Sequence, residues 1–110
     1  MEYAIENEYL IVTVTTWGAQ VKSVVRKFDD VEHMWQADKS VWGYHAPILF
    51  PHTGKVVDDL IETKGEVYQA KQHGFARLME HTLVRQTEDT IVMELRSSEE
   101  TLRIFPYAFR

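Results

Sequence analysis

The sequence has no cysteine, only five glycines and three prolines in 110 residues, and no long hydrophobic run. Without cysteine, disulfide bonds and thiolate metal sites are excluded. The longest apolar stretch, residues 46–50, is interrupted by Pro47 and is far shorter than a membrane span. The acidic start, MEYAIE, lacks the basic and apolar regions of a signal peptide. These features predict a soluble chain in the cytoplasm.

The charge balance is acidic, with a formal net charge of −5. Lysine and arginine are scattered along the chain, whereas a nucleic-acid partner requires a basic face. The content of 45% hydrophobic and 26% charged residues is typical of a globular protein, and the length suits one domain, residues 1–110. We therefore expect no nucleic-acid partner and no association with a membrane.

Alternation of apolar and polar residues, with many β-branched side chains, predicts a mainly β fold. Turn residues separate the candidate strands and favour antiparallel hairpins. An open sheet leaves edges that must be covered, by a partner copy of the chain or by further strands. The expected strands are residues 10–15, 19–26, 32–35, 59–63, 66–68, 82–86 and 91–96.

Two segments favour a helical turn. Residues 38–42 suit a single turn, and Ser97 with Glu100 three positions later resembles a capping box for a helix reaching Ile104. Pro106 keeps that helix short, because it biases the preceding residue away from helical geometry. The fold class predicted is all-β and antiparallel, with at most one or two short helical turns.

Two loop-like segments carry the chemistry. One is HAPILFP at 45–51, the other is QHGFAR at 72–77, and a GK pair at 54–55 lies between them. Glycine and proline hold the backbone in a fixed, non-repetitive path, so that each segment can present a histidine from a loop. The two segments in this order are far more specific than a single His-Gly pair.

These segments, with MWQAD at 34–38 and WGY at 42–44, resemble the N-terminal part of the aldose 1-epimerase family. Within the family the sequence is most similar to the branch between galactose mutarotases and hexose-6-phosphate epimerases. The stretches GAQV at 18–21, SSEET at 97–101 and FPY at 105–107 fit the same pattern. The resemblance implies that residues 1–110 are an N-terminal fragment of a larger antiparallel β-sandwich domain.

The resemblance also implies an activity, the interconversion of the α and β anomers of an aldohexose by ring opening and reclosure. That reaction needs an acid and a base but no cofactor. In the family these are a histidine and a glutamate from beyond residue 110, so the chain alone is expected to be inactive. Two alternatives stay open: a non-catalytic carbohydrate-binding relative, and a hexose-6-phosphate 1-epimerase.

Five residues are candidates for the sugar site. The resemblance implies that His73 contacts the sugar near its ring oxygen and supports catalysis. Lys55 stands where much of the family has arginine, which keeps the charge but loses bidentate geometry. Arg77 could bind a sugar hydroxyl or a phosphate, Phe75 could offer an apolar face to the sugar, and His45 is a weaker candidate. The structural alternatives are a loop-capping histidine, surface cations and a core phenylalanine.

The remaining aromatic and histidine residues are assigned structural roles. Trp35 and Trp42 are expected in the core, because large amphipathic rings favour packing. His33 and His81 lie in strand-like runs and are expected to be partly exposed. No pair of histidines has zinc-like spacing and no acidic loop has the calcium pattern, so we expect no metal site.

Overall fold

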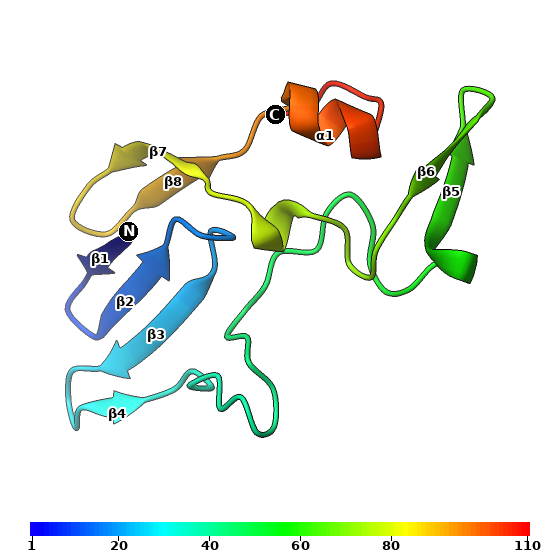
Figure 1. Cartoon of the computed structure of the whole chain (residues 1–110). Coiled ribbons are helices and arrows are strands. Elements are labelled where there is room, and N and C mark those ends of the chain that lie inside the picture. The colour runs from blue at the N-terminus through cyan, green and yellow to red at the C-terminus, as the bar shows by residue number, and fades with distance from the viewer.

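A computed structural model describes all 110 residues and shows antiparallel strands joined by loops, with one short α-helix (Figure 1). Strands β1 to β4 form one sheet in sequence order, and β5–β6 and β7–β8 form two separate hairpins. The predicted all-β, antiparallel fold with short helical turns is therefore confirmed. The elements are β1 (Glu2–Glu6), β2 (Leu10–Thr15), β3 (Val21–Arg26), β4 (Val31–Glu32), η1 (Val57–Asp59), β5 (Leu60–Thr63), β6 (Glu66–Gln69), η2 (Ala76–Leu78), β7 (Thr82–Gln86), β8 (Ile91–Glu94) and α1 (Glu99–Ile104).

The central pair of the sheet follows the predicted pattern. β-Branched residues face each other across β2 and β3, as in the pairs Ile11–Val25 and Val12–Val24, and such cross-strand pairs stabilise a sheet. Strand β1 was not predicted, although its half-buried Tyr3 alternates with exposed neighbours. The first strand thus had a readable period-2 signal that the sequence interpretation missed.

Of the boundaries that differ from the prediction, two have clear local reasons. β3 begins at Val21 rather than at residue 19, because Gly18 and Ala19 have φ angles of +70° and +46° and form the turn. The helix is capped by Ser98, whose hydroxyl accepts from Thr101 N at 3.2 Å while the Thr101 hydroxyl accepts from Ser98 N at 2.8 Å. The capping box predicted at Ser97 was therefore displaced by one residue.

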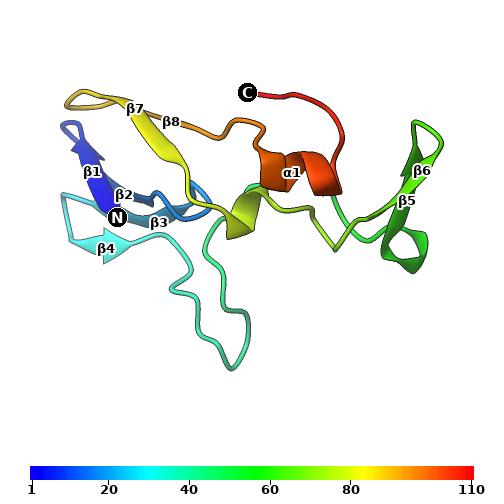
Figure 2. The ribbon, with the colours of Figure 1, turned by 45° about the horizontal axis from the view of Figure 1, so that its top comes forward.

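The β7–β8 hairpin lies beside β1, and the β5–β6 hairpin lies at the opposite end of the molecule, with α1 between them (Figure 2). Glu6 N donates to Glu88 O at 2.7 Å, and Gln86 Nε2 donates to Ala4 O at 2.9 Å. These contacts cover the outer edge of β1, while the two-residue strand β4 forms the other edge of the sheet. None of the helices is long and apolar enough to cross a membrane.

The chain is flat, with principal extents of 55 × 33 × 17 Å and a radius of gyration of 16.5 Å. A compact domain of this length has a radius of gyration of about 13 Å. Only 10 residues are buried, and four of them are apolar. Trp35 and Trp42 are exposed at 44% and 48%, so their predicted core placement was wrong; they contact each other, because Trp35 Nε1 donates to Trp42 O at 2.8 Å. Twenty large apolar side chains of this flat molecule are therefore exposed, with no packing layer over them.

Candidate functional site

The two motif segments meet backbone to backbone. Phe50 and Gly74 form a parallel β-bridge, and Phe50 O accepts from Phe75 N at 2.9 Å and from Ala76 N at 3.2 Å. Gly74 has a φ of +71°, and a Cβ on it would lie 2.1 Å from Phe50 O. Only glycine fits this close approach. The structure thus places the 72–77 segment directly against the end of the 45–51 segment.

His73 is tied to the loop that carries the predicted lysine. Its backbone N–H donates to Gly54 O at 2.9 Å, and its ring Nδ1 accepts from Gly54 N at 2.8 Å. An acceptor nitrogen carries no proton, so the neutral ring of His73 is protonated on Nε2. The other ring nitrogen lies only near the Gln72 amide, at 3.5 Å. His73 is therefore a fixed ring that presents an N–H donor.

Lys55 follows Gly54 and so begins beside His73. Its ammonium lies 3.9 Å from Asp59 Oδ1, and the two side chains are 66% and 42% exposed. An exposed ion pair at this distance contributes little to stability. The Lys55 ammonium is thus exposed and only weakly held.

Phe75 lies inside the molecule, 7% exposed. Its ring packs edge-on to Phe50 at a centroid distance of 5.9 Å and lies 5.9 Å from Phe109. Together with Phe105, these rings form an aromatic cluster beneath the two segments. In this position Phe75 supports the backbone next to His73.

Arg77 and His45 both contact protein groups. The Arg77 guanidinium lies 4.9 Å from the centroid of the Tyr44 ring, and its Nη2 donates to Gln72 O at 3.1 Å. The backbone N–H of His45 donates to Gln20 Oε1 at 3.2 Å. The pKa of the Glu2 carboxyl lies below its usual range, chiefly because of the hydrogen bond from Lys22. His45 is the smallest of the contributing causes. The structure therefore links Arg77 to the residue before His73, whereas the His45 backbone is bound to Gln20 in the turn before β3.

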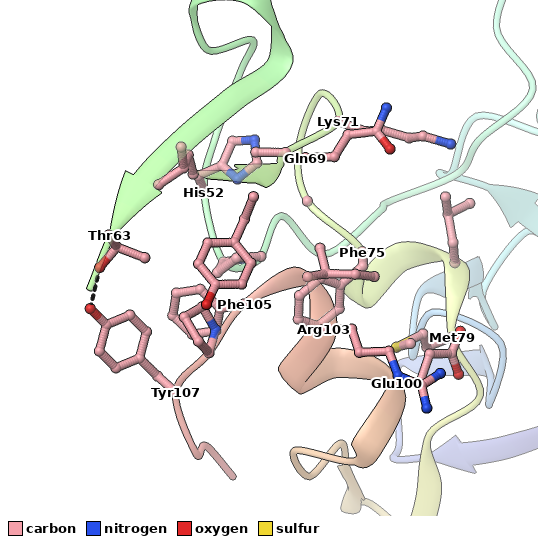
Figure 3. Close-up of a pocket in the computed structure, with 18 of the residues that line it drawn as sticks. His52, Thr63, Gln69, Lys71, Phe75, Met79, Glu100, Arg103, Phe105 and Tyr107 are labelled. Carbon is pink, nitrogen blue, oxygen red and sulfur yellow. Dashed lines mark hydrogen bonds between the residues drawn. The ribbon is translucent and has the colours of Figure 1, made fainter. Parts of the chain in front are cut away.

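A separate cavity of about 580 Å³ opens on the other side of Phe75, between the β5–β6 hairpin and α1. His52 and Phe105 line one part of it, and Glu100, Arg103 and Met79 line another (Figure 3). His73, Lys55, Arg77 and His45 do not line this cavity. Both ring nitrogens of His52 are buried without a partner, and the FPY stretch at 105–107 lines the cavity as well. The cavity thus shares Pro51, Gly74 and Phe75 with the two motif segments, but Phe75 is the one candidate residue that lines it.

Three residues with clear roles in these loops were not predicted. Gly54 supplies both atoms that fix His73, Gln20 accepts from the second histidine segment, and Tyr44 stacks with Arg77. Their contacts join residues 19 to 33 positions apart in the chain, counted from residue 54 to 73, from 20 to 45 and from 44 to 77. All three lie in stretches of the family pattern (GAQV, WGY and GK), but the sequence interpretation gave none of them a role. In addition, no group of three or more His, Asp or Glu side chains could hold a metal ion.

His81 also differs from its predicted partial exposure. It is buried at 7%, its backbone N–H donates to Thr16 O at 2.8 Å, and its Nδ1 lies 3.1 Å from Met79 O. These contacts fix the start of the β7–β8 hairpin against the turn after β2. His81 is a structural residue, whereas His33 is exposed as predicted.

The antiparallel four-stranded sheet, with its two separate hairpins, has the fold of galactose mutarotase-like proteins. A galactose mutarotase related enzyme from Lactobacillus acidophilus is 39% identical and aligns with a TM-score of 0.97 over 98% of this chain and 36% of its own. A galactose mutarotase-like protein from Lactobacillus casei ATCC 334 is 33% identical, with a TM-score of 0.94 over 98% and 37% of the two chains.

The family follows from the whole chain. The model of the aldose 1-epimerase family matches residues 1–110, so the chain belongs to the aldose 1-epimerase family. Protein LacX of Lactococcus lactis subsp. lactis is 33% identical over 114 residues, which cover 99% of this chain. The chain spans 38% of the length of that curated relative. The resemblance inferred from the two motif segments is confirmed.

Proposed function

We propose that this chain supplies one wall of the sugar site of an aldose 1-epimerase that interconverts the α and β anomers of an aldohexose. The observation that carries the proposal is the fixed imidazole of His73, whose Nδ1 is occupied by Gly54 N and whose Nε2 is the protonated nitrogen. Membership of the family supplies the reaction class.

The chemistry divides between a base and an acid. A base removes the proton from the C1 hydroxyl, the bond between C1 and the ring oxygen breaks, and an acid protonates that oxygen. Rotation about C1–C2 and reclosure then give the other anomer. A preorganised N–H donor stabilises negative charge that develops on the ring oxygen. His73 Nε2–H would serve as this donor, and Lys55 would bind a neighbouring hydroxyl.

The exposed apolar surface supports a larger domain. Four buried apolar residues are a small core for 110 residues, and the relatives of known structure are more than twice as long as the part matched. We propose that residues 1–110 are the N-terminal part of a larger β-sandwich, whose further strands cover these side chains. The acid and the base that transfer the protons would then lie outside this chain.

A polarimetric assay tests the proposed function. Freshly dissolved α-galactose and α-glucose relax to their anomeric equilibria, and the full-length protein should accelerate at least one relaxation over buffer and over heat-denatured protein. Calorimetric titration with the same sugars separates the main alternative. Saturable sugar binding without acceleration would replace the isomerase with a carbohydrate-binding protein, and the absence of both would remove the sugar site.

A further inference from the structure

The turn between β2 and β3 contacts the second motif segment through its backbone. Gly18 N donates to Met79 O at 2.8 Å, and a Cβ on Gly18 would lie 2.6 Å from Arg77 O. The φ of Gly18 is +70°, so glycine meets both the conformational and the steric requirement. This turn therefore lies directly on the backbone that follows His73.

The same turn holds the first motif segment through a side chain. Gln20 Oε1 accepts from His45 N at 3.2 Å and from Ala46 N at 3.3 Å. No other protein atom accepts from these two N–H groups. A single amide oxygen thus satisfies two loop donors, which would otherwise lose their hydrogen bonds as the part-buried loop packs on the sheet.

Arg77 and Tyr44 close the connection between the segments. The Arg77 guanidinium stacks 4.9 Å from the Tyr44 ring centroid, and its Nη2 caps the carbonyl of Gln72, the residue before His73. The Arg77 Nε is buried without a partner, so no ligand reaches it from solvent. A planar guanidinium suits this stacked, capping role, which an ammonium does not reproduce.

We propose that Gln20, Tyr44 and Arg77 form a positioning clamp that sets the orientation of His73 toward the sugar. The clamp runs from Gln20 to the backbone of His45, through Tyr44 to Arg77, and from Arg77 to the carbonyl before His73. This inference rests on the proposed function, because it gives His73 the role of donor to the sugar. The sequence predicted Arg77 as a sugar contact; in the clamp it acts on the sugar through His73.

Matched substitutions in the full-length protein separate positioning from general stability. Gln20→Leu removes the acceptor at similar volume, whereas Gln20→Glu keeps an acceptor oxygen in reach of both N–H groups. Tyr44→Leu removes the stacked ring, whereas Tyr44→Phe keeps it and removes a hydroxyl that makes no hydrogen bond with the protein. Arg77→Lys keeps the charge and removes the planar fork. Gln20→Glu and Tyr44→Phe, the conservative members of the two pairs, provide the rescue.

Small displacements of a catalytic group can cost up to about a hundredfold in rate. We expect Gln20→Leu, Tyr44→Leu and Arg77→Lys each to lower kcat about tenfold while KM changes less than about twofold. Gln20→Glu and Tyr44→Phe should keep kcat within about twofold of wild type. Equal losses in Tyr44→Phe and Tyr44→Leu, or losses confined to KM, would overturn the clamp.

A second measurement does not depend on activity. In protein labelled with ¹⁵N-histidine, the resonances of the His73 ring should shift in Gln20→Leu, Tyr44→Leu and Arg77→Lys and stay in place in Gln20→Glu and Tyr44→Phe. Unmoved His73 resonances in Gln20→Leu and Tyr44→Leu refute the clamp whether or not the protein is an epimerase. Shifted resonances in a protein without sugar turnover would support the clamp and refute the proposed function.

Discussion

His73 and Gly54 are joined by two hydrogen bonds that run in opposite directions. The His73 backbone N–H donates to Gly54 O at 2.9 Å, and Gly54 N donates back to the His73 ring at 2.8 Å. Both residues have φ angles in the left-handed region, +65° for His73 and +80° for Gly54. Gly54 thus holds both the backbone N–H and the ring Nδ1 of His73, and Lys55 follows directly.

The tautomer of His73 is the first prediction. In a two-bond ¹H–¹⁵N spectrum recorded at a pH where the ring is neutral, His73 should be protonated on Nε2, because Nδ1 accepts from Gly54. His33, which is exposed and makes no side-chain hydrogen bond, serves as the reference for a ring that exchanges between tautomers. A His73 ring protonated on Nδ1 would show that the Gly54 contact is absent.

Gly74 and Gly65 provide a matched pair for stability. Both have φ angles near +70°, but a Cβ on Gly74 would collide with the Phe50 backbone, whereas a Cβ on Gly65 meets nothing within 4 Å. Gly65→Ala should cost about 1 kcal/mol in the free energy of unfolding, the ordinary cost of a left-handed alanine. Gly74→Ala should cost more than about 3 kcal/mol, because backbone must move. Urea unfolding compares the two, and equal midpoints would contradict the close approach of the segments.

Lys55→Ala should weaken sugar binding without loss of stability. The Lys55–Asp59 pair is exposed, so its removal should change the free energy of unfolding by less than about 1 kcal/mol. Loss of a charged hydrogen bond to a sugar hydroxyl should raise KM about tenfold. Lys39→Ala, at another exposed lysine, is the control and should leave KM unchanged. A normal KM in Lys55→Ala would place this side chain outside the sugar site.

The Glu32 carboxylate gives a prediction for acid stability. The Ser23 hydroxyl, followed by the Val24 N–H, holds the pKa of Glu32 below its usual value of about 4.5. A carboxyl with a lowered folded-state pKa stabilises the protein above its unfolded pKa, and this contribution is lost as pH falls through the folded pKa. Melting temperature should therefore fall below about pH 4.5 less steeply in Glu32→Gln than in wild type. In Glu8→Gln, at an exposed residue without a hydrogen bond, the melting temperature should fall with pH as steeply as in wild type. An equally steep fall in Glu32→Gln would refute the stabilising role of the Glu32 carboxylate.

The sequence predicted the elements whose signal is local. β2, β5 and β7 lie within a residue of their expected bounds, because each has period-2 alternation bounded by turn residues. The helix was displaced by one residue, because adjacent serines offer equivalent caps and the partner of Ser98 is a threonine. Local patterns fix the type of an element better than its ends.

Burial and long-range contacts could not be predicted in the same way. Trp35 and Trp42 were assigned to the core on residue type alone, but residue type does not reveal whether a packing layer lies over a strand. The importance of the 45–51 and 72–77 segments came from their glycine, proline and histidine content, whereas the contacts of Gln20 and Tyr44 depend on which loops the sheet brings together. The family pattern included the stretches that contain Gln20 and Tyr44 but gave no role to either side chain.

The most direct test of the central claim, that His73 Nε2–H acts on the sugar, is the mutarotation rate of full-length His73→Asn. Asparagine tolerates a positive φ and its side-chain oxygen can replace Nδ1 as the acceptor for Gly54 N, but it has no group at the position of Nε2. In polarimetric relaxation of the sugar that the wild type accelerates, His73→Asn should be slower by about a hundredfold, with an unchanged melting temperature. Wild-type turnover in His73→Asn would contradict the account and make His73 a residue that only shapes the loop.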